Sequence, residues 1–174
     1  MSDAHESLGT FERHGDDLEV RFDRFYPRPV ETVWSALTEP ERLKDWMGAS
    51  LVEPRVGGRI ELMIGGVQPM TGRILVWDPP KTLEFTWSNA DTENSVVRYE
   101  LFRDGAGARM IFTHRRIPYV RSGLMLPGWH IFFARLRGLL DGTPPAHSWR
   151  EMQRIYVDHY QLRGVLLDVP KSNG

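Results

Sequence analysis

The sequence predicts one α+β domain, and three features of the chain indicate it. Its 174 residues correspond to roughly one domain at ~150 residues per domain. Between Leu51 and Arg116, apolar and polar residues alternate over short segments that are separated by turn residues, which is typical of an antiparallel meander. Closer to the C-terminal end, apolar residues recur at helical spacing. A sheet with one apolar face has to be covered, so we expect the long helix to pack on it.

The first segments of the chain predict a β-hairpin followed by short helices. Segments 10–13 and 18–26 flank a turn-rich tetrapeptide at 14–17. Pro29 suits the first turn of a helix, and that helix would present an apolar face made of Val30, Val33, Trp34 and Leu37. Thr38 and Glu41 have the spacing of a capping box, which predicts a second short helix ending at Gly48.

Four segments in the middle of the chain show the alternation of half-buried strands. Their inward positions are Ile60, Leu62 and Ile64; Leu83, Phe85 and Trp87; Val97, Tyr99 and Leu101; and Met110, Phe112 and His114. In all, we expect a sheet of about six to seven strands, with the two short helices after the first strand.

Two helices are predicted near the C-terminal end. The long one spans about Gly128 to Asp141. Ser148 and Glu151 form a second capping box, which opens a last helix reaching about Leu167. The last helix is expected to pack on its own domain, with a homodimer contact as the alternative. The long helix is recognised by an apolar stripe of Trp129, Phe132, Phe133, Leu136, Leu139 and Leu140.

These elements divide the chain into three parts. Residues 1–9 are expected to form a mobile tail, residues 10–142 the domain, and residues 143–174 a helical extension packed on it. Neither a signal peptide nor a run of ~18 apolar residues is found, which predicts a cytoplasmic protein without a membrane partner.

Composition and motifs exclude several classes of function. The 22 Lys and Arg against 23 Asp and Glu give a net charge of −1, so no general attraction to nucleic acid is expected. The chain has no cysteine, which excludes thiol chemistry, and none of its six histidines lies four positions from another. The inward strand positions carry no carboxylate pair. We therefore predict no metal, no cofactor and no catalytic residue.

His114 allows two interpretations, because it is the one histidine on the predicted inward face of a strand. It is either a core histidine that is hydrogen-bonded within the protein, or a polar anchor in a ligand pocket. The residues also leave open whether the space between sheet and helix is filled by side chains or forms a cavity.

A set of motifs resembles, in order, the START-like (SRPBCC) superfamily, and in particular the family related to the activator of the heat-shock protein 90 ATPase. The resemblance covers about residues 10 to 160 and implies a helix-grip fold, in which a curved sheet grips one long C-terminal helix over a cavity. Residues 116–127 depart from the usual continuation, so no ligand is implied. The motifs are Pro29-Val30-Glu31-Thr32-Val33-Trp34, Trp46-Met47-Gly48, Gly57-Gly58-Arg59, the stretch from Asp78 to Trp87, Thr113-His114-Arg115 and Gly128-Trp129-His130.

The resemblance favours binding over catalysis. We expect non-catalytic binding of a small hydrophobic or amphipathic ligand between the sheet and the long helix. One alternative is a chaperone-regulating interaction module with a role in stress response. The other is a cyclase- or hydrolase-like enzyme, in which His114 or Tyr99 would act as acid or base. The predicted ligand-binding residues are Trp87, Tyr99, Phe112, His114, Trp129 and Phe133.

Overall fold

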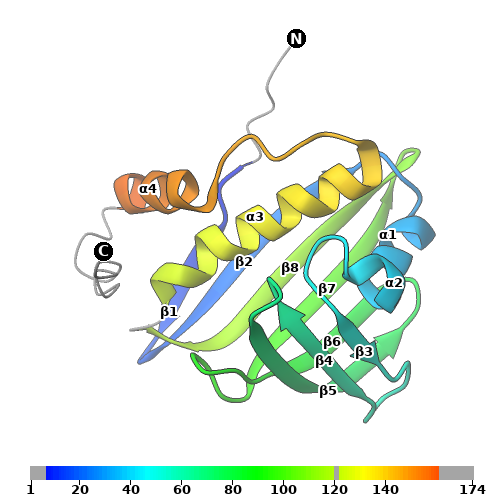
Figure 1. Ribbon diagram of the computed structural model, residues 1–174, viewed down its shortest axis with the longest axis horizontal. Coiled ribbons are helices and arrows are strands. Elements are labelled where there is room, and N and C mark those ends of the chain that lie inside the picture. The colour runs from blue at the N-terminus through cyan, green and yellow to red at the C-terminus, as the bar shows by residue number, and fades with distance from the viewer. Residues whose placement is uncertain (1–6, 120–121, 161–174) are drawn as a thin grey trace.

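The protein is built from a curved, open antiparallel sheet whose concave face is crossed by one long helix (Figure 1). The computed structural model describes residues 7–119 and 122–160, the side chains of 122–124 excepted. The strands are β1 (Thr10–His14), β2 (Asp17–Tyr26), β3 (Ser50–Val52), β4 (Arg59–Ile64), β5 (Gln68–Asp78), β6 (Thr82–Trp87), β7 (Ser95–Asp104) and β8 (Gly107–Pro118). The helices are α1 (Val30–Thr38), α2 (Pro40–Leu43), α3 (Ser122–Asp141) and α4 (Trp149–Tyr160).

The predicted α+β helix-grip fold is confirmed, with a correction to the sheet. The described residues form eight strands rather than six to seven, in the order β1-β2-β8-β7-β6-β5-β4-β3. One cause is the short β3, whose three residues are too few to show alternation. Because β1 pairs with β2 from Thr10 to His14 and belongs to the sheet, the short helices follow the second strand rather than the first.

The concave face is organised in rows that run across the three strands β2, β8 and β7. Val20, His114 and Val97 form one row of register partners, and the next rows along the strands follow the same alternation. These next rows are Phe22, Phe112 and Tyr99, and then Arg24, Met110 and Leu101. An arginine therefore occupies an inward position in an otherwise apolar face.

The two short helices close one end of the sheet, but the predicted capping box at Thr38 and Glu41 is wrong. The Thr38 hydroxyl instead donates a 2.8 Å hydrogen bond to the main-chain oxygen of Trp34, inside α1. A threonine hydroxyl in a helix can donate back to the carbonyl oxygen one turn earlier, and the side chain is then not available as a cap for the next helix. The helix α2 consequently spans Pro40–Leu43 and ends well before Gly48.

The long helix α3 lies diagonally across the concave face (Figure 1). It begins at Ser122 rather than at Gly128 and contains Pro127. The predicted stripe does face the sheet, since Trp129, Phe133, Leu136 and Leu140 are all buried. No helix in the described ranges is long and apolar enough to cross a membrane.

The helix α4 packs against α3 and against the segment before β1. Its predicted capping box is confirmed, because the Ser148 amide donates to Glu151 Oε2 at 2.7 Å and the Glu151 amide donates to Ser148 Oγ at 3.3 Å. The main chain of Gly9 donates to the Tyr156 hydroxyl at 2.7 Å and accepts from the Tyr160 hydroxyl at 2.6 Å. The predicted continuation to Leu167 and residues 1–6 of the predicted tail lie outside the described residues.

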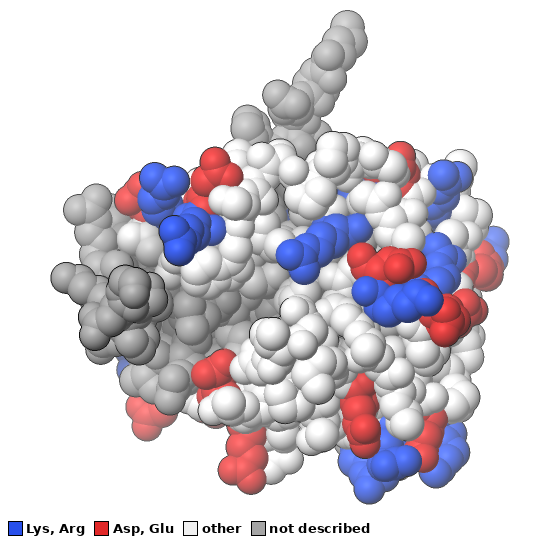
Figure 2. Space-filling view, viewed as in Figure 1, with Lys and Arg blue, Asp and Glu red and all other residues white. Residues whose placement is uncertain are grey.

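Charged side chains are unevenly spread over the face that carries α3. They gather over α4, near α1 and α2 and along the lower rim, while uncharged atoms occupy the middle below α3 (Figure 2).

Replacing Leu136 with Asp is expected to prevent folding, because Leu136 is fully buried in the helix stripe and the substitution would bury an unpaired carboxylate. The loss of unfolding free energy should exceed about 4 kcal/mol. Leu136→Met, which nearly conserves volume, should cost less than about 1.5 kcal/mol. Urea denaturation followed by circular dichroism measures both. A cooperative transition near the wild-type midpoint for Leu136→Asp would show that the stripe is misplaced.

Candidate functional site

The six predicted ligand-binding residues lie together between strands β6, β7, β8 and helix α3. Each side chain is at most 3% exposed. The ring centroids of Phe112 and Trp129 are 4.3 Å apart, those of Phe112 and Phe133 4.9 Å, and those of Trp87 and Trp129 5.2 Å. The aromatic rings thus pack on one another, and a ligand at this position would have to displace them. We call these six residues the aromatic cluster.

His114 is hydrogen-bonded through both ring nitrogens within the protein. Its Nδ1 accepts from Trp129 Nε1 at 3.1 Å, and its Nε2 lies 2.7 Å from Ser95 Oγ, which itself donates to the Trp87 carbonyl oxygen at 2.9 Å. Because Nδ1 accepts, this network assigns the proton to Nε2. The imidazole therefore ties β8 to β7 and to α3. Of the two interpretations, the contacts favour a core histidine, although its partners are side chains rather than the main chain.

Burial also fixes the protonation state of this histidine. The pKa of His114 is lowered from 6.5 to about 3 because its surroundings disfavour the charged form. Burial likewise raises the pKa of the Tyr99 phenol well above its ordinary value. The pKa values of both groups are thus shifted away from 7, which makes either one a poor match for general acid or base catalysis at that pH.

One polar atom of the aromatic cluster remains unsatisfied. The indole Nε1 of Trp87 is buried and has no hydrogen-bond partner within the described part of the chain. A buried donor of this kind is costly unless a water or a bound molecule supplies an acceptor.

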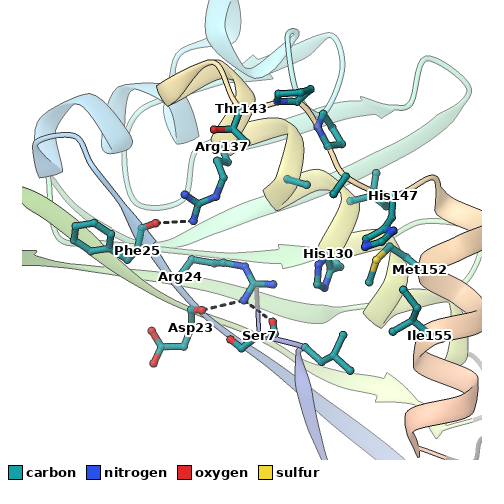
Figure 3. A pocket seen from close by; sticks show the side chains of 16 residues that line it. Ser7, Asp23, Arg24, Phe25, His130, Arg137, Thr143, His147, Met152 and Ile155 are labelled. Carbon is teal, nitrogen blue, oxygen red and sulfur yellow. Dashed lines mark hydrogen bonds between the residues drawn. The ribbon is translucent and has the colours of Figure 1, made fainter. Parts of the chain in front are cut away.

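A cavity of about 890 Å³ lies on the other side of α3, toward β2 and α4 (Figure 3). It is open on one side and is lined by residues of β2, α3, the connection 143–147 and α4, and none of the six predicted residues lines it. Its polar lining includes Arg24, His130, Arg137 and His147. The apolar walls include Leu8, Ile131, Ala134, Pro144, Met152 and Ile155.

The strand β2 places Arg24 at the floor of this cavity. Alternation along β2 points its side chain to the helix side, where it is only 3% exposed. Arg24 Nη1 donates to the main-chain oxygens of Ser7 at 2.9 Å and of Asp23 at 3.0 Å, and the guanidinium lies over the Phe22 ring at 5.0 Å. The sequence analysis missed Arg24, although an arginine at an inward position of an alternating strand was a usable signal.

The charge that faces the cavity is positive within the described lining. Arg137 donates from Nη2 to the Phe25 oxygen at 2.9 Å and pairs with Asp141 at 3.4 Å. The carboxylate of Asp23 turns away from the cavity (Figure 3) and accepts from Arg109 Nε at 3.0 Å. This hydrogen bond from Arg109 is the main reason that the pKa of Asp23 is lowered. The acidic residue of the lining is thus held on the opposite face of the sheet.

His130 connects the cavity wall to α4. Its Nδ1 lies 2.8 Å from the Tyr156 hydroxyl, and its pKa is lowered to about 3, mainly by burial and further by Arg24 and His147. Consecutive residues of α3, Trp129 and His130, therefore point to opposite sides, one to the aromatic cluster and one to the cavity. Among the described residues no group of three side chains could hold a metal ion.

Comparisons with known proteins agree with this architecture. A family model described as "Activator of Hsp90 ATPase homolog 1-like protein" matches residues 27–141. CalU16 from Micromonospora echinospora has a similar fold, with 21% identity and a TM-score of 0.72, over 89% of this chain and 94% of its own. EF2215 from Enterococcus faecalis is 20% identical with a TM-score of 0.73, over 88% and 90%.

A further solved structure is somewhat more similar in sequence. MLL2253 from Mesorhizobium loti is 27% identical, with a TM-score of 0.64, over 73% of this chain and 99% of its own. No curated protein matched the chain.

His114→Phe is expected to lower the free energy of unfolding by about 2–4 kcal/mol. The substitution leaves two buried polar atoms, Trp129 Nε1 and Ser95 Oγ, without their hydrogen-bond partner. Urea denaturation measures the loss, and His14→Phe on the exposed strand β1 is the matched control. An unchanged midpoint for His114→Phe would contradict the structural role, and lost ligand affinity with an intact fold would restore the anchor interpretation.

Stability is expected to fall as the pH decreases from about 6.5 toward 3. His114 and His130 stay neutral in the folded protein down to about pH 3, whereas the unfolded chain binds their protons near the ordinary histidine pKa of 6.5. The unfolded state then holds more protons, and each histidine lowers the free energy of unfolding by up to about 1.4 kcal/mol per pH unit. Above pH 7 the contribution of the two histidines should be constant.

Urea midpoints between pH 7 and 4.5 measure this slope before most carboxylates titrate. His114→Phe should remove about half of it, since one of the two buried histidines is gone. A flat profile in the wild type over this range would contradict the assignment.

Proposed function

The chain belongs to the family of Activator of Hsp90 ATPase homolog 1-like proteins, and from that premise we propose that it binds a small hydrophobic or amphipathic molecule without converting it. The proposed position is the cavity between β2, α3 and α4. One observation carries this proposal, namely a cavity of about 890 Å³ whose apolar walls surround a few fixed polar groups. Ligand pockets typically measure ~300–1,000 Å³ and have such a lining.

The polar groups of the cavity suit positioning better than proton transfer. The guanidinium groups of Arg24 and Arg137 donate hydrogen bonds to main-chain oxygens, which hold them in place. His130 stays neutral and contacts the Tyr156 hydroxyl. Polar side chains that are fixed in this way can orient a bound molecule, and this supports binding without catalysis.

The aromatic cluster is the less favourable position for the same ligand. Its rings already contact one another, so an occupant would have to separate Phe112, Trp129 and Phe133 and forfeit their packing. The unsatisfied Trp87 Nε1 is the feature that supports it. A test of the function should therefore separate the two positions.

A thermal-shift screen against fatty acids, flavonoids and aromatic polyketides is expected to raise the Tm of the wild type with at least one compound. A ligand present at 100 times its Kd stabilises the native state by about 2.7 kcal/mol. Ala134→Trp fills the cavity from α3 and should abolish the shift, while Arg135→Trp, at the next and exposed position, should retain it.

Trp87→Phe removes the unsatisfied donor of the aromatic cluster and should leave the shift unchanged. If the ligand still raises the Tm of Ala134→Trp but no longer raises that of Trp87→Phe, the ligand binds in the aromatic cluster rather than in the cavity. The absence of any shift across the screen would count against the binding function.

A further inference from the structure

We infer that α4 is a flap over the cavity, and that a molecule enters the cavity when α4 swings away from Gly9. The inference concerns how the cavity is reached, so its functional meaning rests on the proposed function. It follows from the walls that α4 supplies, from the contacts that hold α4 in place, and from the segment of chain on which it can turn.

The helix α4 covers an apolar part of the cavity. Met152 and Ile155 project from α4 toward the cavity (Figure 3), and Ile131 of α3 lines it as well. Although the cavity is open on one side, Met152 is only 2% exposed and Ile131 only 7%. An apolar molecule therefore gains little contact with these two side chains as long as α4 stays in place. Moving α4 outward would uncover both of them.

The helix α4 buries little of its own surface. It lies outside the sheet, on α3 and beside the start of β1 (Figure 1). Of its twelve residues, the buried ones are Met152 and Tyr156, which are one helical turn apart on the same face. Elements with few buried apolar side chains open at a lower free energy than the core does. We therefore expect α4 to open while the sheet and α3 stay folded.

Two tyrosine hydroxyls hold α4 to the main chain of Gly9, directly before β1. The Gly9 amide donates to the Tyr156 hydroxyl at 2.7 Å, and the Tyr160 hydroxyl donates to the Gly9 oxygen at 2.6 Å. The Phe11 ring adds an edge contact to Tyr160, with 5.1 Å between the ring centroids. Because both hydrogen bonds end on one residue, a single movement of α4 releases them together. We call these two bonds the latch.

The segment that joins α4 to α3 provides the hinge. Residues 142–148 form neither helix nor strand, and all of them are exposed. Gly142 ends α3 with a φ of +80°, and its amide donates to the Gly138 oxygen at 2.9 Å. Hinges are a few loop or element-terminal residues that absorb changes of φ and ψ. Gly142 is such a position, and the prolines that follow, Pro144 and Pro145, restrict the chain beyond it.

The test uses introduced thiols, because the chain has no cysteine of its own. Ile131→Cys places a thiol on the cavity wall beneath α4, and Val97→Cys places one in the fully buried core of the sheet. The neutral reagent 4,4′-dithiodipyridine labels both. Ile131→Cys should react about 100-fold faster than Val97→Cys or more, because the flap opens more often than the whole domain unfolds. Its rate should depend only weakly on urea, since the opening exposes little surface.

Variants of the latch then test whether α4 is the element that moves. Tyr160→Phe and Tyr156→Phe each remove one hydroxyl of the latch, and each should raise the labelling rate of Ile131→Cys about fivefold. Arg154→Gln, on the exposed side of α4, should leave this rate unchanged. Should Ile131→Cys fail to fold, Met152→Cys reports from the α4 side of the cavity.

Two results would overturn the inference. Equal labelling rates and equal urea slopes for Ile131→Cys and Val97→Cys would mean that the wall is reached only by global unfolding. A rate for Ile131→Cys that neither tyrosine variant changes would mean that the cavity is entered from its open side without movement of α4. Both results are obtained without a ligand. They are therefore distinct from the failure of the thermal screen, which would contradict the proposed function and leave the movement of α4 measurable.

Discussion

The contact between Trp129 and His114 is the interaction on which the arrangement of the core depends. The long helix crosses the sheet diagonally, and an apolar stripe by itself allows such a helix to slide or rotate on an apolar face. The hydrogen bond from the indole of Trp129 to the imidazole, and from the imidazole to Ser95, fixes one rotational setting. Because all three side chains are buried, an alternative setting would leave their polar atoms unsatisfied.

This setting of α3 determines what lies on each of its two sides. On the side of β6 and β7, the rings of the aromatic cluster fill the space under the helix. On the side of β2, the small side chain of Ala134 borders a volume that α4 and the connection 143–147 line without filling. The side chain that interrupts the apolar rows, Arg24, stands in this second space. The aromatic cluster and the cavity therefore lie on opposite sides of α3.

Sequence patterns predicted the core better than the cavity, for physical reasons. Alternation and helical spacing each report which residues face the interior, and the six predicted ligand-binding residues do lie together there, while their role in binding stays a prediction. They do not report whether those residues leave room for a ligand. The strand β5 was not recognised from alternation, because it has Gly72 at an inward position and a register shift between Ile74 and Val76. The position of the cavity was not predicted. Several of its walls come from α4, a connecting segment and the chain before β1, and no local sequence pattern reports how these segments are placed relative to one another.

The two hydrogen bonds that α4 makes to Gly9 have a consequence for the order in which the molecule assembles. The hairpin β7–β8 joins neighbouring segments and can form early, whereas the Gly9 amide and Tyr156 are 147 positions apart. Among the hydrogen bonds of the described residues, those that join Gly9 to α4 close the longest loops, so their formation costs the most chain entropy. We expect them to form after the pairing of β7 with β8 and to be among the first contacts to open in the native state.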